Sequence, residues 1–166
     1  MLTMGWIGSH LRAGALSVAA VMLGPPAMAA MSDPGAVIDM AGRQRMLSQR
    51  VVKAYCQVGL GVTPEVSKAQ LDAAVRRFDR QLAELARDLP NAEARQAHAS
   101  LRQQWREFRR LATGPVSRDG ARRLAARSEE LLRRANQLVT VLQDASGTPQ
   151  ARLVNLSGRQ RMLSQR

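Results

Sequence analysis

The segment LDAAVRRFDRQLAELARDL, Leu71–Leu89, places an apolar side chain at every third or fourth position. This spacing is typical of one face of an amphipathic α-helix, with the arginines and acidic residues on the outer face. The two segments that follow along the chain keep the same spacing. Their repeating positions are Ala94, His98, Leu101, Trp105, Phe108 and Ala112, and then Ala121, Leu124, Ser128, Leu131, Ala135, Leu138 and Leu142.

Short breaks separate these helices and give each one a recognisable start. Asp33 before Pro34 begins a first helix that should run to about Gly59, Thr63-Pro64 begins the second, and Asn91 is the expected cap of the third. Consecutive amphipathic helices with short links pack antiparallel. We therefore predict an all-α fold, an antiparallel four-helix bundle over residues 33–146, with a fifth helix over residues 148–166.

The nine residues GRQRMLSQR occur twice, at Gly42–Arg50 and at Gly158–Arg166, a separation of 116 residues. Solenoid repeats have periods of about 20–50 residues, so this separation fits a duplicated small domain better. The fifth helix is then the opening helix of a second, truncated unit.

The N-terminal residues have the order of a secretory signal peptide. A basic start is followed by the apolar run Ala13–Leu23, two prolines and the small-residue site Ala27-Met28-Ala29. We predict a signal peptide over residues 1–29 and a periplasmic mature chain; the alternative is a chain anchored in the membrane through an uncleaved signal.

Composition limits the classes of function. The net charge of +12 comes mostly from arginine and favours an anionic partner, although export argues against nucleic acid. With His98 as the only histidine of the mature chain and Cys56 as the only cysteine, neither a metal site nor a Cys-His nucleophile is expected. We expect no cofactor, no catalytic residues and no enzymatic activity, and we interpret His98 as a core residue.

The first helix carries two lengthwise faces. One face is mostly apolar and should pack inside the bundle: Val37, Met40, Gln44, Leu47, Val51, Ala54 and Val58. The other, called here the motif face, consists of Ile38, Gly42, Arg45, Gln49, Val52 and Cys56. On it, Gly42 would let another backbone approach, and a buried Arg45 would need an anion or acceptors. The planar guanidinium suits carboxylate or nitrate. The alternative is that Arg45 reaches solvent and the motif is only a packing element.

The segment AGRQRMLSQRVVKAY, Ala41–Tyr55, resembles the opening helix of the PilJ-type domain, the N-terminal sensory domain of type IV pili methyl-accepting chemotaxis transducers. It is also similar to the sensor module of nitrate/nitrite-responsive histidine kinases, although those sensors lack the Arg43-Gln44 pair. The resemblance implies a periplasmic four-helix bundle that forms a homodimer through its first helix and binds an anion at the dimer axis. It assigns the anion contact to Arg45, repeated as Arg161, the glycine of the motif to Gly42 and Gly158, and the closing arginine to Arg50 and Arg166. With Gln49 of the motif face added, the candidate ligand-binding residues are Arg45, Gly42, Gln49, Arg50, Arg161 and Gly158.

The leading hypothesis is therefore a periplasmic sensing domain for a small anion (nitrate, nitrite or a carboxylate). It has no output domain of its own and is expected to act through a membrane-bound signalling partner. The first alternative is a structural dimerisation module without a ligand, which should tolerate lysine or glutamine at Arg45. The second is a polyanion binder, whose binding would depend strongly on salt.

Overall fold

The computed structural model describes residues 33–164, and every secondary-structure element in that range is an α-helix. This confirms the predicted all-α fold. The predicted signal peptide lies outside the described residues, as do the last two residues of the second motif copy. The five helices are α1 (Pro34–Gly59), α2 (Pro64–Leu85), α3 (Ala92–Ala112), α4 (Arg118–Ser146) and α5 (Pro149–Leu163).

Side-chain caps fix most of the helix starts. The Asp33 carboxylate accepts from the backbone N–H of Gly35 at 2.9 Å, and the Asn91 side chain accepts from that of Ala94 at 2.8 Å. Such caps satisfy backbone donors that have no partner inside the helix. The predicted caps of the first and third helices are confirmed.

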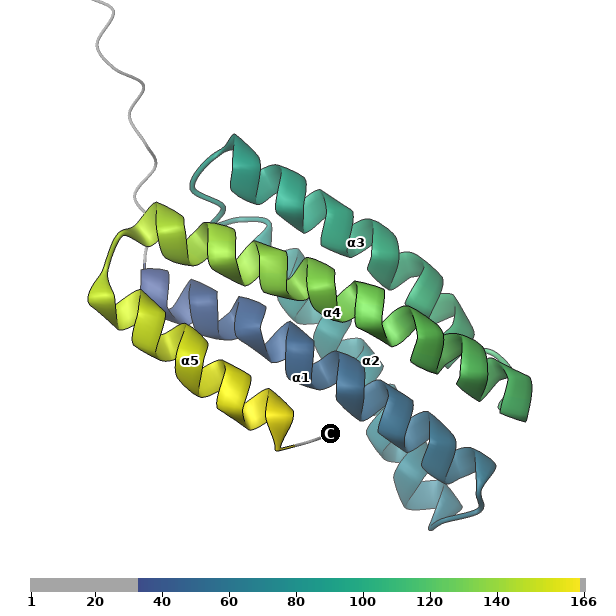
Figure 1. Ribbon diagram of the computed structural model, residues 1–166. Helices are drawn as coiled ribbons and strands as arrows, with labels where there is room; N and C mark the ends of the chain where they lie inside the picture. The colour runs from purple at the N-terminus through teal and green to yellow at the C-terminus, as the bar shows by residue number, and fades with distance from the viewer. Residues whose placement is uncertain (1–32, 165–166) are drawn as a thin grey trace, which may run out of the picture.

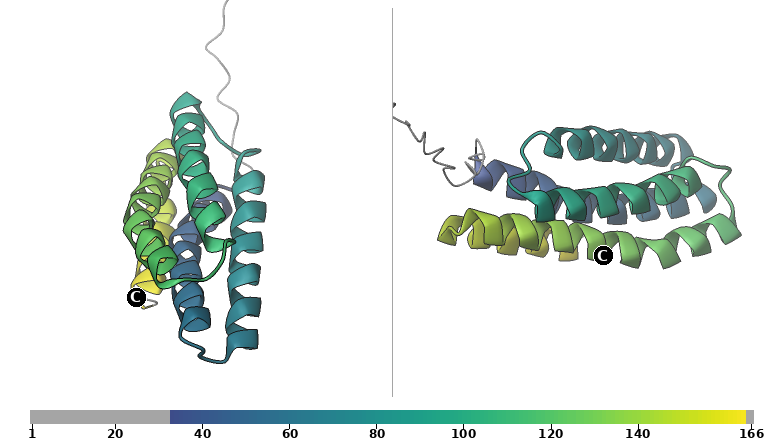
Figure 2. Two further views of the ribbon diagram at one scale, coloured as in Figure 1. Left: turned by 90° about the vertical axis from the view of Figure 1, so that its right-hand side faces the viewer. Right: turned by 90° about the horizontal axis from the view of Figure 1, so that it is seen from above.

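Helices α1 to α4 run up and down as an antiparallel bundle, in which α1 packs against both α2 and α4 and α3 packs against α4 (Figure 1). After the turn at Gly147, α5 reverses direction again. It therefore runs parallel to α1, beside the first part of that helix (Figures 1 and 2). Helix α1 thus has α2, α4 and α5 as neighbours.

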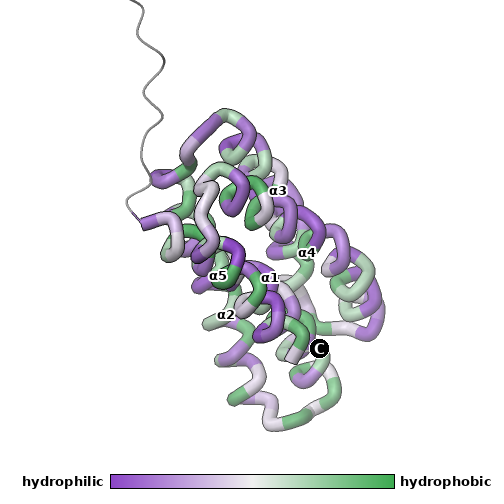
Figure 3. The backbone as a smooth tube through the Cα atoms, turned by 60° about the vertical axis from the view of Figure 1, so that its left-hand side comes forward, coloured by the Kyte–Doolittle hydropathy of each residue, from purple (hydrophilic) through white to green (hydrophobic). Residues whose placement is uncertain are grey.

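The core lies between the inner faces of the helices, and the tube in Figure 3 changes between hydrophilic and hydrophobic within each helix, as amphipathic helices require. Large aromatic side chains fill the space between α2 and α3, where Phe78 stacks on Trp105 with ring centroids 3.7 Å apart. The Trp105 indole donates to Asp79 at 2.7 Å. His98 is buried, with Nε2 2.7 Å from the Leu82 carbonyl oxygen, which confirms it as a core residue.

Tyr55 ties the end of α1 to the connection between α3 and α4. Its buried hydroxyl donates to the Pro115 carbonyl at 3.0 Å and accepts from the Ser117 backbone N–H at 3.2 Å. Gly120 leaves room for the ring, because a Cβ there would lie 2.2 Å from the Tyr55 hydroxyl oxygen.

Within residues 33–164, none of the helices combines the length and the apolar character needed to cross a membrane.

Candidate functional site

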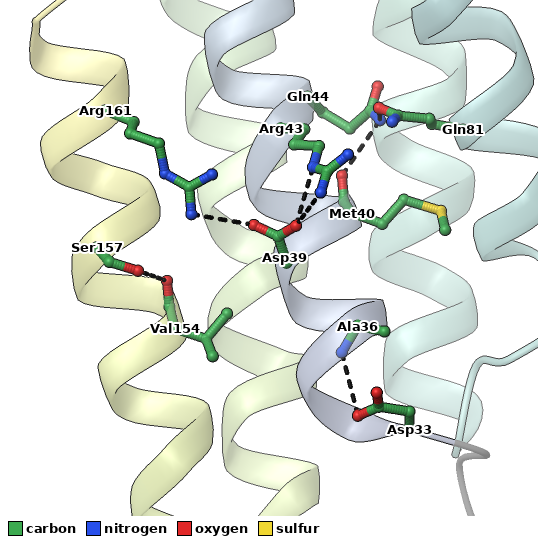
Figure 4. A network of polar contacts seen from close by, with 10 residues as sticks. All are labelled: Asp33, Ala36, Asp39, Met40, Arg43, Gln44, Gln81, Val154, Ser157 and Arg161. Carbon is green, nitrogen blue, oxygen red and sulfur yellow. Dashed lines mark hydrogen bonds and ion pairs between the residues drawn. The ribbon is translucent and has the colours of Figure 1, made fainter.

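The mostly apolar face of α1 lies inside the bundle, as predicted. Its one polar member, Gln44, is fully buried and donates from Nε2 to Gln81 of α2 at 3.1 Å and to the Met40 carbonyl at 3.3 Å (Figure 4). The buried Gln44 Oε1 has no hydrogen-bond partner among the described residues. This amide pair is the polar link between α1 and α2.

Arg45 is the most deeply buried cation of the motif, with 2% of its surface exposed. Its Nη1 donates to Asn155 Oδ1 of α5 at 2.9 Å and to Asn136 Oδ1 of α4 at 3.2 Å. Nη2 donates to the Asn155 carbonyl at 3.3 Å, and Nε donates to the Gly42 carbonyl at 3.4 Å. All of these acceptors are neutral. Burial, and secondarily the positive charge of Arg159, lower the pKa of Arg45 from its ordinary value.

Two glycines, one from each copy of the motif, make the space for this guanidinium group. A Cβ at Gly42 would lie 3.1 Å from Arg45 Nη2, and a Cβ at Gly158 would lie 3.0 Å from the same atom. Both glycines are in ordinary helical backbone, so their role is close approach and not a special turn. The missing side chains let α1 and α5 come together around Arg45.

A cavity of about 190 Å³ lies next to these glycines, between α1, α2 and α5. Its lining contains three arginines from three helices and one carboxylate; the lining residues are Asp39, Gly42, Arg43, Met46, Leu47, Arg77, Gly158 and Arg161. Arg45 itself is not among the lining residues, but two of them, Gly42 and Gly158, are the glycines that leave room for its guanidinium group.

Asp39 holds two of the cavity's arginines. It accepts from Arg43 one turn further along α1, with the Nε bond at 2.9 Å, and from Arg161 Nη2 of α5 at 3.3 Å (Figure 4). Arg77 of α2 takes part in none of the ion pairs recorded in the described part of the chain. The cavity therefore has more positive than negative charge.

The structure brings four of the six predicted ligand-binding residues together, namely Gly42, Arg45, Gly158 and Arg161. Arg50 lies apart from them, on a separate cavity of about 320 Å³ between α1 and α2 that Lys53 and Arg77 also line. Gln49 is half-buried, and its Nε2 has no partner among residues 33–164.

Arg77, Asn136 and Asn155 were not predicted. None belongs to a local motif, and each reaches the site only through the packing of its own helix. The one available signal is for Asn155, because it occupies the position in the second copy that Asp39 occupies in the first.

The motif face was expected to face a second chain, and the structure shows a different neighbour for its first half. There Ile38, Gly42 and Arg45 are all buried, and α5 of the same chain packs against α1 and accepts hydrogen bonds from Arg45. Helix α5 is joined to α4 by a short turn, which places it beside α1. The later positions Val52 and Cys56 are only partly buried. Pairing with a second chain stays a prediction.

A family model described as "Type IV pili methyl-accepting chemotaxis transducer N-term" matches residues 27–131. The match spans α1, α2, α3 and the first part of α4, and it includes the first motif copy but not the second. No curated protein and no solved structure matches the chain.

Proposed function

Since the chain belongs to the PilJ family of N-terminal chemotaxis transducer domains, we propose that it is a periplasmic sensing domain that binds a small planar anion beside Arg45. The family is a sensory one, which agrees with the expectation that the chain is not an enzyme. The anion, the periplasmic location and a membrane-bound signalling partner are parts of the proposal.

The observation that carries the proposal is the buried Arg45 guanidinium with only neutral acceptors. A cation taken out of water loses several kcal/mol of solvation, and neutral amide oxygens replace only part of it. The lowered pKa of Arg45 has burial as its main cause, which indicates the same deficit. An anion nearby would restore the balance.

The cavity that both motif glycines line offers a place for that anion. Arg43, Arg77 and Arg161 approach it from three different helices, and Asp39 is the only acid in its lining. Guanidinium groups present paired N–H donors that match the planar oxygens of nitrate, nitrite and carboxylate. A volume of about 190 Å³ exceeds that of one water molecule, about 30 Å³, several-fold. The cavity therefore has room for an anion of a few heavy atoms.

The alternative is a structural helix-pairing module without a ligand. It is favoured by the number of hydrogen bonds that Arg45 already makes within the chain. On this alternative, added anions have no specific effect on the protein.

Thermal unfolding in the presence of anions separates the two. The mature chain is titrated with sodium nitrate, nitrite or acetate while chloride keeps the ionic strength constant. A ligand at one hundred times its dissociation constant should stabilise the protein by about 2.7 kcal/mol. Arg45→Met should lose this stabilisation, and Arg77→Ala should weaken it.

Arg95→Met is the matched control, because Arg95 is an exposed arginine on α3, away from the cavity. It should respond to the anions as the wild type does. Equal shifts in wild type and Arg45→Met would place the anion elsewhere, and no shift with any of the three anions would favour the structural alternative.

A further inference from the structure

The contacts between α1 and α5 are reciprocal. Arg45 of α1 donates to Asn155 of α5, and Arg161 of α5 donates to Asp39 of α1. In the repeat, Arg161 is the counterpart of Arg45, and Asn155 is the counterpart of Asp39. Each contact therefore becomes the other when the two copies of the motif are exchanged.

Reciprocity of this kind is the property of a two-fold interface, in which residue i meets residue j and j meets i. Here the two helices run in the same direction (Figure 1). Side chains on a helix lean toward its N-terminus. In a parallel pair both arginines can then reach back to the earlier position on the neighbouring helix. The motif, taken with the residue three positions before it (Asp39 or Asn155), is thus complementary to a parallel copy of the same segment.

The acceptors of the two arginines differ in charge. Arg161 meets a carboxylate, whereas Arg45 meets the amide of Asn155. If α5 were replaced by α1 of a second copy of the chain, Asp39 of the second copy would stand where Asn155 stands. Both arginines would then meet carboxylates, and hydrogen bonds between two charged groups are stronger than those to a neutral amide.

Helix α5 lacks this carboxylate, but unlike the helix of a second copy it belongs to the same chain and is tethered to α4 through a short turn. A tether of this kind gives a local concentration in the millimolar range. The anchoring of α5 is otherwise slight, since only Ala151 and Met162 of this helix are buried.

We propose that the face of α1 covered by α5 is a self-association surface, and that α1 of a second copy competes with α5 for it. This inference rests on the predicted pairing of first helices and not on the proposed binding of an anion. In the monomer α5 takes the place of the partner's helix; when α5 leaves, two copies join through α1.

The test compares full-length mature chains by sedimentation velocity, without added anion. Ala151→Glu combined with Met162→Glu should release α5, because it puts charges at the two buried positions of that helix. Leu153→Glu combined with Leu156→Glu is the matched control, since both leucines are more than half exposed. Asn155→Asp should hold α5 more firmly, because it offers Arg45 a carboxylate.

The dimer fraction should be lowest in Asn155→Asp and equal in the wild type and the control. It should be highest in the double variant Ala151→Glu, Met162→Glu, called here the released variant. Adding Asp39→Asn to the released variant should raise its dimer dissociation constant about tenfold or more, because the carboxylate is then lost from both copies. This last variant separates specific pairing from association through exposed apolar surface.

Cys56 supplies a second readout. It lies on the motif face beyond the part that α5 covers, since α5 ends at Leu163, the counterpart of Leu47. In a parallel α1 pair the two Cys56 side chains approach each other, so oxidation should cross-link the released variant and not Asn155→Asp. The proposal is overturned if the released variant stays monomeric while amide exchange shows that residues 149–163 have detached. It is also overturned if Asp39→Asn leaves its dimer unchanged. Neither result affects the anion titration, which is read separately.

Discussion

Replacing Arg45 by methionine is the most direct test of whether this residue serves stability or binding. Methionine keeps the length and flexibility of the arginine stem and removes the charge and the donors. Of the four hydrogen bonds that Arg45 makes, the one to Asn155 Oδ1, at 2.9 Å, is the shortest; the one to Asn136 lies at the upper end of the ordinary range at 3.2 Å, and the other two are 3.3 and 3.4 Å long. A hydrogen bond to a charged group contributes about 1.5–3 kcal/mol, and we assign that value to this single bond.

The opposing term is the solvation that the buried guanidinium loses, an effective penalty of several kcal/mol. The two terms nearly cancel. The free energy of unfolding of Arg45→Met should therefore be at most about 1 kcal/mol below that of the wild type, or above it. For a domain of this size the melting temperature should then change by no more than about 4 °C downward. The assay is urea and thermal unfolding followed by circular dichroism at 222 nm.

Arg161→Met is the control, since Arg161 is the counterpart of Arg45 but its side chain is 58% exposed. Its ion pair with Asp39 should contribute less than about 1 kcal/mol. A loss of more than about 3 kcal/mol in Arg45→Met, the usual result of breaking a required buried pair, would show that Arg45 stabilises the fold. The argument that its buried charge is retained for a ligand would then be refuted.

Two further predictions concern other parts of the molecule. Gly120→Ala should lower the free energy of unfolding by about 1–3 kcal/mol in urea titrations, because its Cβ would lie 2.2 Å from the Tyr55 hydroxyl oxygen. Gly114→Ala is the control and should change the free energy of unfolding far less, since its Cβ would have ordinary clearance at 3.4 Å. Equal effects of the two substitutions would contradict the role given to Tyr55. The pKa of Glu130 is lowered, chiefly by the hydrogen bond from Arg133, so any stability it contributes is present above its ordinary pKa and is lost as the pH falls through the lowered value. Wild type and Glu130→Gln should therefore converge in stability in acid, and a difference that grows as the pH falls would contradict this sign.

The helices could be predicted because their limits are set by neighbouring residues. The end near Gly59, the start at Thr63-Pro64 and the caps at Asp33 and Asn91 are local signals, and the structure follows them closely. The inward face of each helix followed from spacing alone, since side chains three and four positions apart share a face.

The site could be predicted only in part. The spacing of residues on the first helix and the resemblance to the PilJ-type domain pointed to Arg45 and the two glycines. Which acceptors Arg45 would find was beyond local reasoning, since Asn136 and Asn155 reach it from α4 and α5. Likewise, Arg77 has no motif and joins the cavity only because α2 packs against α1.

The parallel direction of α5 has a consequence for the order in which the molecule opens. Each helix carries a macrodipole, positive at its N-terminus and negative at its C-terminus. Antiparallel neighbours such as α1 and α4 place opposite ends together, whereas α1 and α5 place like ends together. The dipole of α5 is therefore unfavourable toward α1, its main neighbour, and only two side chains of α5, Ala151 and Met162, are buried to hold it there. We expect residues 149–163 to exchange their amide protons well before the rest of the bundle, as the lowest-stability cooperative unit of the fold.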